Sequence, residues 1–129
     1  MKKYPKTVAT IVYFGDKIAL AKRLNTHTYS GYWEVPGGKV DPTDENIQKA
    51  ASREIQEEMN YFVHWTELEL VDCAADESTD YCFIFKHWTA SPNFHDVGNK
   101  ERNKRTHWKL FTKEEALKLD LMPGIKENL

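Results

Sequence analysis

The chain has 129 residues, of which 40% are hydrophobic and 29% charged, a balance typical of one folded domain and not of a disordered segment. A formal net charge of −2 excludes the general basic surface of a nucleic-acid binder, so no nucleic-acid partner is expected. No apolar run approaches the roughly 20 residues of a membrane span, and the N-terminal basic residues lack the apolar segment of a secretion signal. With two cysteines, the chain is expected to be a cytoplasmic protein with reduced thiols and no membrane partner.

The first third of the chain is expected to form strands around a polar loop at residues 24–32. β-Branched and aromatic side chains predict these strands at residues 7–14, 17–22 and 33–35. Gly15 and Asp16 form the turn between the first two strands. The Pro-Gly-Gly sequence at residues 36–38 is expected to stop the third strand.

The longest helical pattern covers residues 42–59. Asp41 suits the N-cap position, and Pro42 suits the first helical position because its missing N–H is not needed there. Asn60 follows the last periodic residue and suits the left-handed conformation that ends many helices.

The second half of the chain is expected to alternate strands with turns and to end in helices. Strands are predicted at residues 68–74, 81–88 and 108–111. A turn at 76–80 joins the first two, and a loop at 90–105, with a solvated basic run at its end, precedes the third. Thr112 with Glu115 forms a capping box that opens a second helix, and a short helix is expected after Pro123. This order of elements indicates a mixed α/β domain.

Three glutamates share an arc of the predicted helix beside its apolar stripe: Glu54, Glu57 and Glu58. Arg53 is a basic partner for Glu57 at helical spacing, whereas Glu54 and Glu58 have none three or four residues away. A solvated acidic face is the alternative, but such faces usually intersperse lysines. Convergent carboxylates without such partners suit a hard divalent cation, Mg²⁺ or Mn²⁺.

A Pro-Gly-Gly-Lys segment at residues 36–39 lies between a predicted strand and this helix. A glycine pair lets the backbone approach a ligand closely, and its amides can hold phosphate, although many such segments are simple turns. Together the two segments predict a site with metal-binding carboxylates on a helix and a close-approach loop at its start.

These residues resemble the Nudix box, and the chain is similar to the MutT-type nucleotide pyrophosphohydrolases of the Nudix family. The box reads Gly, five residues, Glu, seven residues and then Arg-Glu-U-x-Glu-Glu-x-Gly-U, where U is a bulky apolar residue. The matching positions here are Gly38, Glu45 counted back from Arg53, Arg53, Glu54, Ile55, Glu57 and Glu58. Residues 33–38 also resemble the family's approach to the box. The similarity is strong over residues 7–61 and concerns only the order of elements after that.

The chain departs from the box at three places. One residue is inserted between Gly38 and Glu45, so Asp44 is the alternative occupant of the first acidic position. Asn60 replaces the box glycine, and it tolerates a positive φ better than most residues. Tyr61 takes the final apolar position. Since no presumed metal ligand is lost, an active enzyme is expected.

The resemblance implies that residues 1–129 form a single Nudix domain, an α/β/α sandwich with a mixed β-sheet between helices. It implies Mg²⁺-dependent hydrolysis, with Mn²⁺ as a substitute, of a nucleoside diphosphate linked to another group. The leading expectation is a MutT-like enzyme for nucleoside or deoxynucleoside triphosphates, including oxidised ones. The alternatives are a Nudix hydrolase of nucleotide sugars, dinucleoside polyphosphates or RNA caps, and a non-catalytic nucleotide-sensing module. Both a monomer and a homodimer remain open.

The resemblance also implies roles for individual residues. The implied catalytic residues are Arg53, Glu54, Glu57, Glu58 and Glu101. The implied metal ligands are Glu54, Glu57, Glu58, Gly38 and Glu101. The implied substrate-binding residues are Arg23, Glu34, Gly37, Gly38, Lys39, Leu121 and Met122. Glu101 is chosen because MutT-type enzymes often use an acidic residue from the loop before a late strand; its rivals are Asp96, Glu77 and Asp80.

Overall fold

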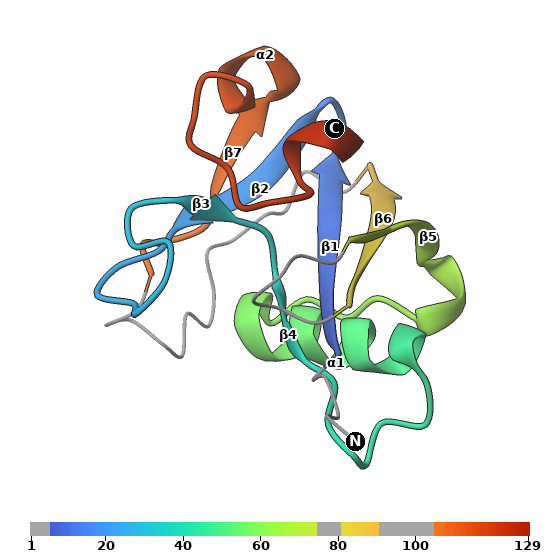
Figure 1. Ribbon diagram of the computed structural model, residues 1–129. Helices are drawn as coiled ribbons and strands as arrows, with labels where there is room; N and C mark the ends of the chain where they lie inside the picture. The colour runs from blue at the N-terminus through green and yellow to red at the C-terminus, as the bar shows by residue number, and fades with distance from the viewer. Residues whose placement is uncertain (1–5, 75–80, 91–104) are drawn as a thin grey trace.

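The computed structural model describes residues 6–74, 81–90 and 105–129, which form a mixed β-sheet with helical segments on both faces (Figure 1). The strands are β1 (Thr7–Phe14), β2 (Lys17–Lys22), β3 (Trp33–Glu34), β4 (Gly37–Lys39), β5 (Glu69–Ala74), β6 (Cys82–Thr89) and β7 (Lys109–Thr112). The α-helices are α1 (Ile47–Met59) and α2 (Lys113–Ala116), and two 3₁₀ turns are η1 (Trp65–Glu67) and η2 (Lys126–Asn128).

The sheet has the strand order β3-β2-β1-β6-β5, with β4 paired to β1 and β7 paired to β2. β1 and β6 are parallel over their whole length, from Thr7 opposite Cys82 to Phe14 opposite Thr89, and the other pairs are antiparallel. The central strand β1 therefore carries β4, and with it the start of the Nudix-like motif, at its N-terminal end.

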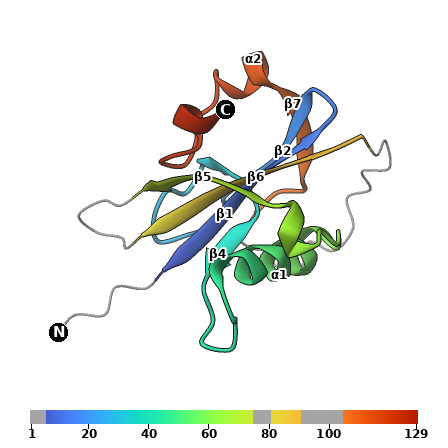
Figure 2. The same ribbon diagram turned by 90° about the vertical axis from the view of Figure 1, so that its right-hand side faces the viewer.

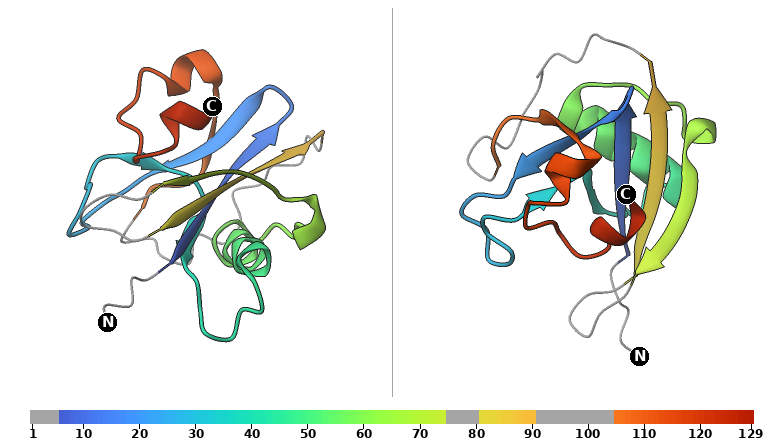
Figure 3. Two further views of the ribbon diagram at one scale, coloured as in Figure 1. Left: turned by 45° about the vertical axis from the view of Figure 1, so that its right-hand side comes forward. Right: turned by 90° about the horizontal axis from the view of Figure 1, so that it is seen from above.

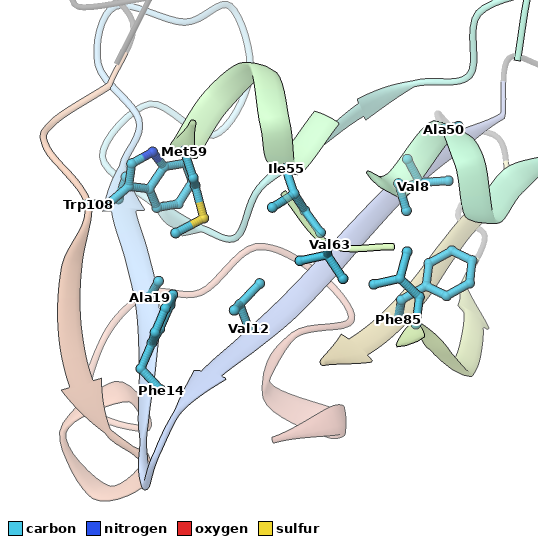
Figure 4. Packing of buried hydrophobic residues seen from close by; sticks show 13 residues of the cluster. Val8, Val12, Phe14, Ala19, Ala50, Ile55, Met59, Val63, Phe85 and Trp108 are labelled. Carbon is cyan, nitrogen blue, oxygen red and sulfur yellow. The ribbon is translucent and has the colours of Figure 1, made fainter. Parts of the chain in front are cut away.

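Helix α1 covers one face of the sheet, and the C-terminal segment with α2 and η2 covers the other (Figures 2 and 3). β1 supplies both layers because its side chains alternate: Val8 and Val12 pack toward α1, whereas Ile11 packs toward Ala116 and Ile125. Figure 4 shows the buried side chains between the sheet and α1, among them Val12 of β1, Ile55 of α1 and Phe85 of β6. This arrangement confirms the α/β/α sandwich.

Helix α1 begins five residues later than the sequence pattern predicts. Its N-cap is Asn46, whose side chain accepts a hydrogen bond from the Lys49 N–H, and not Asp41. Asp41 instead closes a turn, because its carboxylate accepts from the Thr43 N–H and its own N–H donates to Asp44. The local hydrogen bonds available to aspartate thus outcompete the helix over 42–46. Asn60 does end the helix in the left-handed conformation, with φ 51°.

The third predicted strand does end before the Pro-Gly-Gly segment, since β3 ends at Glu34, but the two glycines belong to a further strand that was not predicted. Gly37 and Gly38 belong to β4, which pairs with Ala9 and Val8 of β1. The turn η1 was not predicted, whereas the Thr112–Glu115 capping box is confirmed and the helical turn after Pro123 is present as η2. Across the described parts of the chain, every helix is too short or too polar to cross a membrane.

Candidate active site

Strand β4 and helix α1 meet at two glycines whose missing side chains make the contact possible. A Cβ on Gly37 would lie 2.2 Å from the Val8 carbonyl oxygen, so only glycine lets β4 pair so closely with β1. A Cβ on Gly38 would lie 2.7 Å from the Glu54 carboxylate. The glycine pair therefore creates the space in which a carboxylate of α1 reaches the strand.

Glu54 and Glu58 are one helical turn apart at this contact, and each carboxyl group influences the pKa of the other. Burial raises the pKa of Glu54, with Arg53 opposing that shift. Burial also raises the pKa of Glu58, to about 8, despite the opposing charge of Arg105. The Gly37 N–H donates to Oε2 of Glu58 over 3.0 Å. Two largely desolvated carboxyl groups thus converge on the β4 backbone.

Arg53 organises the other acidic groups of the motif. Its Nε and Nη2 donate to the two oxygens of Asp44 over 3.0 and 2.9 Å, and its Nη2 also donates to the Lys39 carbonyl. Its Nη1 contacts Glu54 at 3.0 Å and Glu57 at 3.1 Å. These hydrogen bonds lower the pKa of Asp44 and raise that of Arg53.

The inserted residue is therefore absorbed in the turn before the helix, and Asp44 takes the position facing the arginine. Glu45 points to solvent, where it forms an ion pair with Lys49 at 2.7 Å. Of the two residues that the sequence left open for the first acidic position, the structure places Asp44 against Arg53.

A second group of charges extends the site toward β2 and β3. Arg105 is buried and contacts Glu58 through Nη1 at 3.0 Å and Glu34 through Nε at 3.2 Å. The other oxygen of Glu34 accepts from Nη1 of Arg23 over 2.8 Å. The Arg105 guanidinium also lies 5.6 Å from the ring centroid of Trp108, whose indole N–H donates to the Glu58 carbonyl. Charged side chains thus form a continuous chain from Arg23 to Glu58.

A cavity of about 290 Å³ opens beside these charges, on the face of the sheet that carries the C-terminal segment. Its polar end holds Arg23 and Glu34, and the backbone of Gly37 and Gly38 forms part of its wall. The apolar walls come from Val8, Ala9, Val35, Met122, Pro123 and Ile125. A mostly apolar recess with a few convergent polar groups is typical of a small-molecule site.

The structure brings together most of the residues singled out from the sequence. Arg23, Glu34, both glycines and Met122 line the cavity, whereas Leu121 instead forms a backbone bridge with Trp33. Lys39 is exposed and contributes its carbonyl to Arg53. In the described ranges, no three His, Cys, Asp or Glu side chains are gathered in a position to hold a metal ion.

Glu57 is the glutamate of the motif that stands apart, with its side chain 48% exposed and bound to Arg53. Glu101 and its rivals, Asp96, Glu77 and Asp80, lie outside the described residues. Their assignment stays a prediction.

Arg105 is the site residue that sequence reasoning missed. It ends a run of basic residues that was expected to be solvated, yet its side chain is only 10% exposed. It is brought to the site by an isolated bridge to Arg23 and by the Thr106 N–H, which donates to the Lys22 carbonyl. No local signal distinguishes it from the other basic residues of the run, since both of its carboxylate partners are far away in the sequence.

The chain belongs to the Nudix family, since the NUDIX domain model matches residues 3–129. It is a hydrolase that acts on pyrophosphate bonds, as the family and its curated relative indicate.

Among known proteins, a CTP pyrophosphohydrolase of Escherichia coli is 32% identical over 122 residues, which cover 95% of this chain and 86% of that protein. The NUDIX domain of Shewanella oneidensis NrtR, solved with ADP ribose, matches with TM-score 0.73 at 18% identity, over 94% of this chain and 80% of that one. MutT from Aliivibrio salmonicida and Vibrio cholerae matches with TM-score 0.70 at 21% identity, over 97% and 96% of the two chains. A MutT/nudix family protein from Enterococcus faecalis, at TM-score 0.70 and 17% identity over 87% of this chain, is much longer, and 45% of it is covered.

Proposed function

We propose that this chain is a Mg²⁺-dependent pyrophosphohydrolase of nucleoside and deoxynucleoside triphosphates, including oxidised ones, of the MutT type. The observation that carries the proposal is the pair of buried carboxyl groups, Glu54 and Glu58, held against Gly37 and Gly38, whose backbone forms part of the cavity wall near Arg23 and Glu34. The triphosphate would lie at the polar end of the cavity, and the nucleoside would enter the apolar part.

The donor set fits a magnesium ion. Nudix hydrolases generally use divalent metal ions, and the chemistry of the site offers carboxylate oxygens, which Mg²⁺ prefers. Glu54, Glu57 and Glu58 would hold the ion, with the Gly38 carbonyl and Glu101 as further ligands. Mg²⁺ is usually bound by one or two carboxylates together with substrate phosphates, so a gathered cage of three protein carboxylates is not required. When bound, the ion would neutralise charge on the phosphate oxygens.

The chain's own residues would position the reacting groups. Arg23, a guanidinium fork at the cavity, would donate to phosphate oxygens once released from part of its contact with Glu34. Arg53 would orient Glu54 and Glu57, to which it is already bonded. Glu101 would accept a proton from the attacking water, as the family pattern suggests. Lys39, Leu121 and Met122 complete the proposed substrate contacts.

The substrate can be identified with a panel of nucleotides. Purified protein is incubated with Mg²⁺ and CTP, dCTP, GTP, 8-oxo-dGTP, ADP ribose or a dinucleoside polyphosphate, and the products are separated by chromatography. We expect a nucleoside monophosphate and pyrophosphate from a triphosphate, with CTP tested first because the E. coli relative bears that name. Metal-dependent binding without turnover of any member would favour the nucleotide-sensing alternative instead.

Mg²⁺ binding can be tested without a substrate. An ion that binds only the folded protein raises the free energy of unfolding by about 2.7 kcal/mol at 100 times its Kd. Thermal melts with Mg²⁺, at an ionic strength matched with NaCl, should show this gain in the parent and lose most of it in Glu58→Gln. Identical responses of the two proteins, with and without nucleotide, would contradict the metal site. We also expect the protein to be cytoplasmic and to form either a monomer or a homodimer of one Nudix domain. Light scattering, which gives the molar mass in solution, distinguishes the monomer from the homodimer.

A further inference from the structure

Figure 1 shows the loop between β2 and β3. This loop holds a tyrosine that lines the cavity and has an unusual backbone conformation. Tyr29 has φ 54°, in the left-handed region that bulky L-residues rarely adopt. Asn25 and Gly31 of the same loop also have positive φ, but those residue types tolerate it well. A strained aromatic residue persists where the surrounding structure enforces it, and such residues cluster at ligand sites.

Hydrogen bonds tie this loop to the polar end of the cavity. The Gly31 N–H donates to the Arg23 carbonyl over 2.8 Å, and the Tyr32 N–H donates to the Tyr29 carbonyl over 3.1 Å. The Arg23 side chain, which contacts Glu34, also donates through Nη2 to the Thr28 carbonyl over 3.2 Å. The position of Tyr29 is therefore set relative to the proposed phosphate-binding arginine.

Tyr29 differs from the rest of the cavity in its chemistry. Among the described residues that line the cavity, it carries the only aromatic ring, and the apolar residues of the lining are otherwise non-aromatic. Its neighbour Tyr32 is equally exposed, at 37% against 36%, but does not line the cavity. Tyr32 packs edge-on against Tyr29, with ring centroids 5.3 Å apart, and thereby supports the ring.

We propose that Tyr29 is a substrate-binding residue that stacks its ring on the nucleobase. The inference rests on the proposed function, since it takes the ligand to be a nucleotide whose phosphates lie near Arg23. A planar, unsaturated base is the group that an aromatic face recognises, and stacking tolerates any base. Tyr29 thus adds affinity for the nucleoside part and none for the phosphates.

The test compares two ligands and three variants by titration calorimetry with Mg²⁺. The ligands are a non-hydrolysable CTP analogue and inorganic tripolyphosphate, which has no base. In Tyr29→Gly, we expect the affinity for the nucleotide to fall at least fivefold while the affinity for tripolyphosphate is unchanged. Its melting temperature should not fall, because glycine relieves the positive φ. Tyr29→Phe should bind both ligands like the parent, and the matched control Tyr32→Ala should lose less than threefold.

Each outcome has one meaning. If Tyr29→Gly binds the nucleotide like the parent, or loses both ligands equally, Tyr29 does not stack on the base and the inference is wrong. If its melting temperature falls and Tyr32→Ala loses as much nucleotide affinity, Tyr29 only maintains the loop. If the parent binds neither ligand, the proposed function fails and the inference falls with it, whereas a parent that binds nucleotide tests Tyr29 alone.

Discussion

The acidic residues of one sequence motif lie in two different environments. Glu54 and Glu58 are buried against β4, and burial raises the pKa of both. Glu45 is exposed, and its contact with Lys49 lowers its pKa. Glu57 is half exposed and bonded to Arg53.

This difference between the buried and the exposed glutamates shows that spacing along the sequence does not by itself assign a chemical role to a carboxylate. A carboxylate that has lost water gains most from a bound cation, because the cation replaces solvation that the folded protein does not supply. A carboxylate in solvent with a lysine beside it gains little. The buried pair is therefore where metal chemistry is expected.

The largest effect should come from Glu58. Replacing it with glutamine removes a charged oxygen ligand with little change in volume, and we expect kcat to fall about 1000-fold, which is about 4 kcal/mol in the barrier. Steady-state hydrolysis of the best substrate measures this. The control variant Glu45→Gln changes an exposed glutamate of the same motif and should keep kcat within a few-fold of the parent. Equal losses in the two variants would contradict the separation of roles.

The next largest effect should be on stability, at Arg105. Its guanidinium contacts both Glu34 and Glu58 in a buried setting, so at pH 9, where Glu58 is ionised, Arg105→Gln leaves the Glu58 carboxylate without that cation. Breaking a buried ion pair by removing one partner costs about 3 kcal/mol. Urea denaturation at that pH measures the free energy of unfolding, with the exposed Lys109→Gln as the matched control. A loss no larger than that of the control would show that Arg105 is not needed by the buried carboxylates.

A smaller effect should appear in the pH dependence of stability. The pKa of Glu58 is raised from the ordinary 4.5 to about 8, so the folded protein keeps a proton that the unfolded chain releases. The contribution of Glu58 to the free energy of unfolding is full below pH 4.5 and is lost as the pH rises through about 8. The free energy of unfolding should therefore fall by about 2 kcal/mol between pH 6.5 and 9. Denaturation in EDTA should show this decline in the parent and a flatter profile in Glu58→Gln. Parallel profiles would mean that Glu58 does not carry the proton.

The smallest effect should separate the two candidates for the first acidic position. Asp44→Asn weakens a charge-assisted contact with Arg53 and should cost about 1.5 kcal/mol at pH 7. Because the pKa of Asp44 is lowered by folding, this stabilisation is present above its ordinary pKa and is lost as the pH falls through the folded value. Glu45→Gln should leave the free energy of unfolding unchanged. The reverse order would place Glu45, and not Asp44, against Arg53 in solution.

Most strands could be predicted from local patterns. Alternation and β-branched residues located β1, β2, β5 and β6 to within about one residue, because side-chain periodicity is a property of neighbours in the sequence. The Asn60 cap and the Thr112 capping box were predicted for the same reason. Strand β4 was not predicted, because Gly37 and Gly38 have no strand propensity and pair only because β1 lies beside them.

The sequence by itself determined the Nudix family and the set of glutamates, because both depend on residue types at fixed spacing. Only the tertiary structure decided which of those glutamates are desolvated, that Asp44 replaces Glu45 at Arg53, and that Arg105 is buried between Glu34 and Glu58. Burial and long-range ion pairs arise when distant segments pack together, and a pKa depends on that packing and not on neighbours in the sequence.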